Sequence, residues 1–242
     1  MPGDWHASHT ISAGAPYDTA RLFRSVIYAV GQDATLWHHR GGFYAWNGAA
    51  YSGIDELEIR ASLYGFLDQC AELDQNGKPR RFRPNKSRVG NVLDGLIAAA
   101  NLPSSIEAPA WLDPQAIEPA DVIACRNGLL HVPDRTLITH SPALFIHNAV
   151  DFDFEADAIA PTLWLEFLDQ LWADDTESID ALQEIFGLML TGETRHQKAF
   201  LLVGPKRSGK GTIARVLMGL VGKPNCVSPT LASLGTISGS RH

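Results

Sequence analysis

The 242-residue sequence predicts an α/β fold in which a small mixed α+β N-terminal region precedes the incomplete start of a P-loop nucleotide-binding core. Two observations carry this prediction. Helical and strand-like periodicities alternate through the first half of the chain, and an apolar run near the end is followed by a glycine-rich turn and a helical pattern. We expect a mixed module over 1–120, a strand-turn-strand and helical lead-in over 121–195, and a partial ATPase core over 196–242.

The N-terminal region contains three predicted helices and a group of aromatic strands. Apolar residues recur at helical spacing in 17–30, 55–73 and 86–101. Residues 35–51 are typical of short strands, and Asn47-Gly48 supplies the positive φ angles of a tight turn.

The second half continues with strands, then helices. Residues 122–139 predict strands joined by turns, and 161–172 and 175–191 predict amphipathic helices. The run AFLLV at 199–203 predicts a short buried strand, and 212–221 predicts the helix that follows it.

Charge is distributed in blocks along the chain. The net charge is −7, but residues 75–93 hold six bases and no acid, 151–194 hold twelve acids and no Lys or Arg, and 195–242 hold eight bases and no acid. Such blocks indicate regions that face different partners. No apolar run approaches the ~20 residues of a membrane helix, so we expect no membrane partner. No secretory signal is visible and the three scattered cysteines match no zinc or redox spacing, so we expect a reduced, cytoplasmic protein.

The glycine-rich turn has the pattern Gly204-x-x-x-x-Gly209-Lys210. Glycines let consecutive N–H groups point at anionic oxygens, a helix N-terminus adds its positive dipole end, and the lysine adds a full charge. This arrangement predicts a triphosphate-binding loop for ATP. The predicted cofactor-binding residues are Gly204, Pro205, Lys206, Arg207, Ser208, Gly209, Lys210, Gly211 and Thr212.

One position departs from the usual motif. Gly211 stands directly after the lysine, where Ser or Thr usually binds the metal, and Thr212 follows one residue later. Thr212 is therefore the predicted Mg²⁺ ligand, with its direct role left open.

The basic segment is a candidate for DNA contact. Arg80, Arg81, Arg83, Lys86 and Arg88 could bind phosphates, with Phe82 stacking on a base. The alternative is a solvated, proline-broken loop. Asp151 and Asp153 superficially match a two-metal motif, but their acidic connecting segment favours a solvated loop instead.

Several short stretches, in a fixed order before the loop, resemble the phage and plasmid primase-helicase family. They are Asn127-Gly128-Leu129, His140-Ser141-Pro142, Leu190-Thr191-Gly192 and Gln197-Lys198, and the resemblance covers about 120–225. It implies an AAA+-like superfamily 3 helicase core used in DNA replication, which hydrolyses ATP with Mg²⁺, forms a homo-oligomeric ring and acts on single-stranded or forked DNA.

The family's acidic strand, sensor and arginine finger follow the loop, yet residues 195–242 contain no Asp or Glu. We therefore expect a C-terminally truncated chain, assign no catalytic residue in it, and doubt that it hydrolyses ATP alone. Two other functions stay open: a non-catalytic DNA-binding or oligomerisation module with a vestigial loop, and a nucleoside or nucleotide kinase, which the Gly-Lys-Gly-Thr order suggests but the late position of the loop disfavours.

Overall fold

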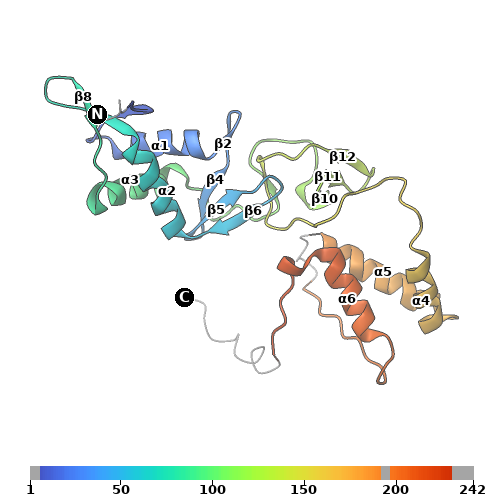
Figure 1. Cartoon of the computed structure of the whole chain (residues 1–242). Coiled ribbons are helices and arrows are strands. Elements are labelled where there is room, and N and C mark those ends of the chain that lie inside the picture. The colour runs from blue at the N-terminus through green and yellow to red at the C-terminus, as the bar shows by residue number, and fades with distance from the viewer. Residues whose placement is uncertain (1–5, 192–196, 231–242) are drawn as a thin grey trace. The chain divides into compact units, whose positions relative to one another are not determined.

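The computed structural model describes residues 6–191 and 197–230 (Figure 1). Within these residues it has a mixed α/β fold with six α-helices and several small sheets. The chain divides into two compact units: unit 1 is Met1–Pro114 with Ser141–His147, and unit 2 is Gln115–His140 with Asn148–His242. No helix in the described part of the chain is both long enough and apolar enough to cross a membrane. The division into 1–120, 121–195 and 196–242 stays a prediction about sequence modules.

Three helices form the framework of unit 1, one in each region that the periodicity predicted, although the helix predicted for 55–73 ends at Asp68 and residues 70–73 form a strand instead. The helices are α1 (Pro16–Ile27), α2 (Glu56–Asp68) and α3 (Lys86–Ala99). Side chains cap two of them, because Asp55 accepts from the N–H of Leu57 and Asn85 accepts from that of Arg88.

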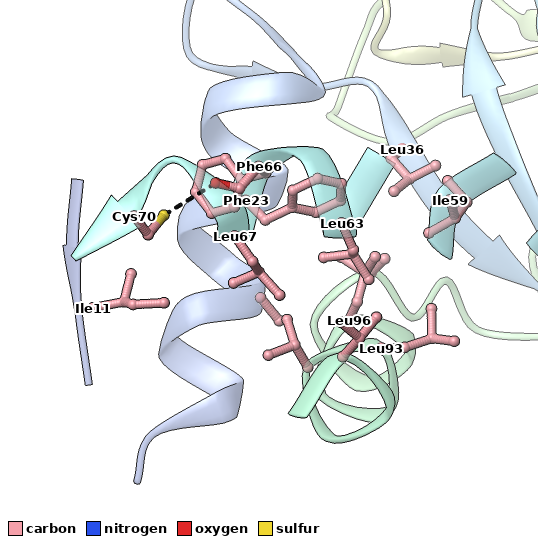
Figure 2. Packing of buried hydrophobic residues seen from close by; sticks show 14 of the residues in the cluster. Ile11, Phe23, Leu36, Ile59, Leu63, Phe66, Leu67, Cys70, Leu93 and Leu96 are labelled. Atoms are coloured by element: carbon pink, nitrogen blue, oxygen red, sulfur yellow. Dashed lines mark hydrogen bonds between the residues drawn. The ribbon is translucent and has the colours of Figure 1, made fainter. Parts of the chain in front are cut away.

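The core of unit 1 lies where these helices meet (Figure 2). Phe23 of α1, Leu63 and Leu67 of α2 and Leu96 of α3 are completely buried. The Cys70 thiol, which directly follows α2, is also buried and donates to the Phe66 carbonyl at 3.3 Å. Apolar residues at helical spacing therefore give each helix one face that packs into a shared core.

Small sheets complete unit 1. The short strand β1 (His9–Ile11) pairs in parallel with β7 (Cys70–Leu73), which pairs antiparallel with β8 (Pro79–Arg81). The predicted aromatic strands are the antiparallel set β4 (Leu36–His39), β5 (Gly42–Trp46) and β6 (Tyr51–Ile54). Two-stranded ladders join β2 (Ala29–Val30) to β3 (Asp33–Ala34) and β9 (Ala110–Trp111) to β13 (Leu144–Phe145). The β5–β6 connection occupies 47–50 and includes the predicted Asn47-Gly48 pair, but only Gly48 adopts a positive φ, 108°. Asn47 contributes through its side-chain oxygen, which accepts from the N–H groups of Ala49 and Ala50.

The return of residues 141–147 to unit 1 depends on Tyr51. Its buried phenol donates to the Pro142 carbonyl at 2.6 Å, and its N–H donates to the Ile146 carbonyl at 2.7 Å. Burial raises the pKa of Tyr51 to about 12, so the phenol stays protonated and able to donate.

Unit 2 begins with an antiparallel sheet of β10 (Val122–Cys125), β11 (Gly128–His131) and β12 (Thr136–Ile138). It continues with α4 (Thr162–Trp172), α5 (Thr176–Leu190) and α6 (Lys210–Val221). Two short 3₁₀ turns lie at Pro119–Asp121 and Lys223–Asn225. The three helices share a small core of buried Leu168, Leu182, Phe186 and Ile213.

The prediction of a buried strand at 199–203 is wrong. This segment belongs to no strand, and Leu201 and Val203 are 86% and 83% exposed. A strand needs a neighbour for its N–H and C=O groups, and no described residue pairs with this segment. The sequence shows that this segment is apolar, but it does not show that the segment lacks a neighbouring strand in the described structure.

Candidate functional site

The glycine-rich loop leads directly into α6, as the sequence predicted. Gly209 is the N-cap of α6, it adopts φ 77°, and no side chain caps the helix. A helix leaves its first N–H groups without intrahelical acceptors, and they carry the positive end of its dipole. The loop therefore lies at an uncapped, electropositive helix end.

Lys210 lies across the loop rather than pointing away from it. Its Nζ donates to the carbonyls of Gly204 at 2.8 Å and Pro205 at 2.7 Å, and to the Ser208 hydroxyl at 3.1 Å. The ammonium group is thus held inside the curve of the loop, beside the start of α6.

Two of the loop glycines lie in close contact with neighbouring side chains. A Cβ at Gly204 would lie 2.7 Å from the Ser208 Oγ. A Cβ at Gly209 would lie 2.9 Å from the ring of Phe167 and 3.0 Å from Leu171, both of α4. The loop therefore rests on α4, and the tight turn around the ammonium depends on missing side chains.

Gly211 differs from these two glycines, because nothing lies within 4 Å of a Cβ placed there. The next residue, Thr212, accepts a hydrogen bond from Arg215 at 3.3 Å. The described residues contain no group of three or more His, Cys, Asp or Glu that could hold a metal ion. The role of Thr212 toward Mg²⁺ stays a prediction.

Ion pairs occupy three of the five predicted DNA-binding residues. Arg81 pairs with Asp68, while Arg80 and Arg88 both pair with Glu72, at 3.1 and 2.6 Å. Glu72 is only 4% exposed, so these pairs hold a buried carboxylate in place.

Phe82 is not available to stack on a base. It is 3% exposed, and the Arg88 guanidinium lies 4.2 Å above its ring. The expectation of stacking was wrong because a single aromatic residue among charges can also be a core anchor. Within the described ranges, the side chains of Lys78, Arg83 and Lys86 form no ion pair.

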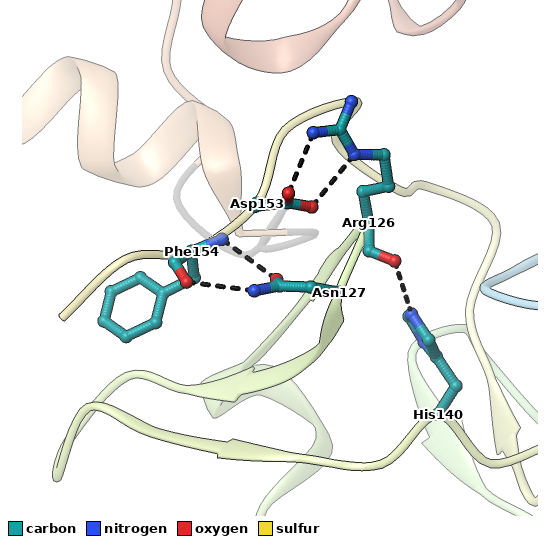
Figure 3. Close-up of polar contacts among 5 residues, drawn as sticks. All are labelled: Arg126, Asn127, His140, Asp153 and Phe154. Carbon is teal, nitrogen blue, oxygen red and sulfur yellow. Dashed lines mark hydrogen bonds and ion pairs between the residues drawn. The ribbon is translucent and has the colours of Figure 1, made fainter. Parts of the chain in front are cut away.

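The structure gives a structural role to Asn127, which the sequence singled out only for its resemblance, and to Asp153, which superficially matched a metal motif. Arg126 forms a two-bond ion pair with Asp153, with both distances 2.9 Å (Figure 3). Beside it, the Asn127 amide donates to the Phe154 carbonyl and accepts from the Phe154 N–H. These contacts, which we call the 126–154 clamp, fasten the acidic connecting segment to the β10–β11 turn.

His140 adds a weaker contact to the clamp, since its Nε2 lies 3.4 Å from the Arg126 carbonyl (Figure 3). Hydrogen bonding to Arg126 lowers the pKa of Asp153 below its usual value. Asp153 therefore serves as an ion-pair partner, and no metal-ligating group forms around it in the described residues. Spacing could not reveal this pairing, because Arg126 and Asp153 are 27 residues apart. Gly192, in the Leu190-Thr191-Gly192 stretch, lies outside the described residues.

The family model described as "D5 N terminal like" matches residues 27–173, more than half of the chain. The chain belongs to the D5 N-terminal-like family. This family is the N-terminal region of D5-like primase-helicases of phages and plasmids. The D5 N-terminal-like match includes the 126–154 clamp and the basic segment, and it ends at α4. The glycine-rich loop at 204–212 lies beyond it.

Proposed function

We propose that this chain binds the triphosphate of ATP in the 204–212 loop, as part of a phage- or plasmid-type replicative primase-helicase. The observation that carries the proposal is the position of Lys210, whose ammonium lies inside the loop beside the uncapped start of α6. Family membership supports the replication context, because this region belongs to primase-helicases.

The residues of the loop have separable roles in this proposal. The Lys210 ammonium exchanges its carbonyl partners for phosphate oxygens, and the first N–H groups of α6 donate to the same oxygens. Gly204 and Gly209 allow the turn, because a side chain at either position would collide with a neighbour. Mg²⁺ would neutralise phosphate charge, with the Thr212 hydroxyl as its proposed ligand.

We further propose that the chain binds ATP without turning it over alone. Hydrolysis in P-loop enzymes needs a carboxylate to hold the metal and a polar group to orient water. Residues 195–242 contain no Asp or Glu, so the segment around the loop supplies no such carboxylate.

Calorimetric titration of ATP, adenosine and inorganic triphosphate into the full chain tests the loop. We expect ATP and triphosphate to bind and adenosine to bind weakly, since the loop recognises phosphates. Lys210→Ala should weaken ATP binding by at least about tenfold, which corresponds to loss of one charge-assisted contact.

Lys223→Ala is the matched control, because it removes an exposed lysine beyond the end of α6. Equal ATP affinities for the two variants would contradict the proposal, as would adenosine binding as tightly as ATP. ATP turnover that Lys210→Ala abolishes would refute the second proposal and leave the first intact.

A second candidate function is binding of single-stranded or forked DNA. It is favoured by Lys78, Arg83 and Lys86, which form no ion pair in the part of the chain that the structure describes. Removing Arg83 and Lys86 together should reduce the salt dependence of single-stranded DNA binding by about two phosphate contacts. Arg81→Ala is the control, because that side chain is already paired with Asp68. Unchanged anisotropy titrations of a labelled strand would reject this role.

Assembly into a homo-oligomeric ring also stays a proposal.

A further inference from the structure

A cavity lies in unit 1. It has a volume of about 710 Å³ and lies along one face of α1 beside the β2–β3 turn. Its lining includes Tyr17, Arg21, Arg24, Ser25, Gly31 and Gln32, and we call it the α1 pocket. The volume falls within the ~300–1,000 Å³ typical of small-molecule sites.

Arg24 carries a charge that the protein leaves incompletely compensated. Its Nε donates to the Leu36 carbonyl and its Nη1 donates to the Ala99 carbonyl, both at 2.9 Å. Its guanidinium also lies 4.3 Å above the Trp37 ring. The Nη2 atom is buried and has no hydrogen-bond partner among the described residues.

Burial lowers the pKa of Arg24, which means that its surroundings penalise the cation. Buried charges are usually paired with a carboxylate, but no ion pair of the described residues includes Arg24. An anion in the adjoining pocket would supply the missing opposite charge.

Arg21 adds a second cation at the same opening. It lies three residues before Arg24 on α1, so the two side chains share one face of the helix. Arg21 is exposed and likewise forms no ion pair within the described ranges. Guanidinium groups with free donors suit the several oxygens of a phosphate.

The other groups of the pocket narrow the ligand further. Asp18 is an acid in the lining, but it lies in the first turn of α1, where the helix dipole offsets its charge. Tyr17 lies one turn before Arg21 and is 48% exposed, which leaves its ring free to stack on a flat group. One face of the helix thus presents an aromatic surface followed by two cations.

We propose that the α1 pocket binds a nucleotide, with its phosphate at Arg21, beside the buried charge of Arg24, and its base against Tyr17. The phosphate can come from a free mononucleotide or from the 5′ end of a DNA strand, which present the same chemistry. The proposal concerns unit 1 alone, so it stands or falls separately from ATP binding in the 204–212 loop.

The test uses the full chain carrying Lys210→Ala, which silences the loop, and calorimetry with dAMP and with inorganic phosphate. We expect dAMP to bind more tightly than phosphate. Arg21→Glu should weaken dAMP binding by at least about tenfold, because it replaces a phosphate contact with a repelling charge. Tyr17→Ala should weaken dAMP binding about fivefold or more and leave phosphate binding unchanged.

Arg135→Glu is the matched control, since it makes the same charge change on the β11–β12 turn of unit 2. Arg21 and Tyr17 are exposed side chains, so we expect both variants to fold, and circular dichroism verifies this. Equal dAMP affinities for Arg21→Glu and Arg135→Glu would overturn the proposal, as would phosphate binding as tightly as dAMP.

A pair of otherwise identical short thymidine strands, with a 5′-phosphate or a 5′-hydroxyl, separates the two sources. Tighter binding of the phosphorylated strand than of dAMP and of the hydroxyl strand identifies a strand end as the ligand. Tighter binding of dAMP identifies a free nucleotide. Both results support the pocket, and no binding of dAMP or of the phosphorylated strand overturns it.

Discussion

Unit 1 and the helical part of unit 2 are built from similar amphipathic segments, but they bury them to different extents. In unit 1, α1, α2 and α3 share a continuous core that includes completely buried Phe23, Leu63 and Leu96. In unit 2, the core of α4, α5 and α6 contains four buried residues, and its aromatic neighbours Trp164 and Phe167 are only partly buried.

The difference shows that amphipathic periodicity predicts a helix, but does not predict how completely other parts of the protein bury its apolar face. Leu163 and Leu201 in unit 2 are 81% and 86% exposed, although their surrounding sequence is as apolar as that of unit 1. Unit 1 surrounds its apolar side chains with small sheets, whereas residues 199–203 have no strand beside them in the described structure. Burial, and with it most of the stabilisation, depends on these neighbours.

Truncation of a core leucine should give the largest difference in stability loss between the two units. Leu63→Ala should destabilise unit 1 by about 2–5 kcal/mol, because its packed neighbours cannot fill the cavity. Leu168→Ala, also nearly fully buried, should cost less, since its partly buried neighbours can relax into the space. Urea unfolding measures the loss of stability in each variant, and amide hydrogen exchange shows in which unit the loss occurs. Leu163→Ala is the control, and equal losses at Leu63 and Leu168 would remove the contrast.

The ion pairs offer a second comparison. Arg88→Ala should destabilise unit 1 by about 2 kcal/mol, since it takes a charged hydrogen bond from nearly buried Glu72 and uncovers Phe82. Arg126→Ala in unit 2 should have a smaller effect, because that pair is solvent-exposed. Thermal unfolding of both variants compares the two losses of stability. A larger loss for Arg126→Ala than for Arg88→Ala would contradict the prediction.

The loop glycines test how firmly the loop is tied to α4. Gly209→Ala should destabilise the helical part of unit 2 by about 1–2 kcal/mol, because it places a side chain at positive φ and against Phe167. Gly211→Ala should be neutral or stabilising, since open space and a helical position favour alanine. Hydrogen exchange of α6 distinguishes them, and equal protection in both variants would show that the contact with Phe167 is unimportant.

The smallest expected effect is the pH dependence of the 126–154 clamp. The pKa of Asp153 is lowered, so its ion pair stabilises the folded state above the ordinary Asp pKa of about 4. That contribution is lost as the pH falls through the lowered value. An NMR titration should show a midpoint for Asp153 that rises toward the ordinary value in Arg126→Gln. Identical midpoints in the two proteins would mean that the pair does not persist in solution.

Much of the secondary structure could be predicted because it depends on local patterns. The spacing of Leu63 and Leu67 predicts α2, and the β5–β6 turn follows from the backbone freedom of Gly48 and the accepting side chain of Asn47. The glycine-rich loop before α6 was predicted for the same reason, since its glycines and lysine are consecutive in sequence.

The failures all concern contacts between side chains that local periodicity and turn chemistry do not specify, even where the two partners are close in sequence. Phe82 is equally compatible with a base-stacking surface and a buried anchor until Arg88 is placed over it. The chemistry of Arg80 changes once Glu72 lies beside it. The α1 pocket was not predicted at all. The side chain of Arg24 is held there by hydrogen bonds to the carbonyls of Leu36 and Ala99, and folding alone brings these groups together.

The sequence by itself determined the six described helices, the strand regions at 35–51 and 122–139, and a glycine-rich loop that ends in a lysine at the start of a helix. It did not predict the short strands at 9–11, 70–73 and 79–81, whose partners are brought together only by folding. The tertiary structure decided which apolar segments are covered, which arginines are paired, and where a charge is left without a partner. The physical reason is that periodicity and turn chemistry act within a few residues of the chain. Burial and ion pairing, by contrast, depend on side chains that only folding brings together.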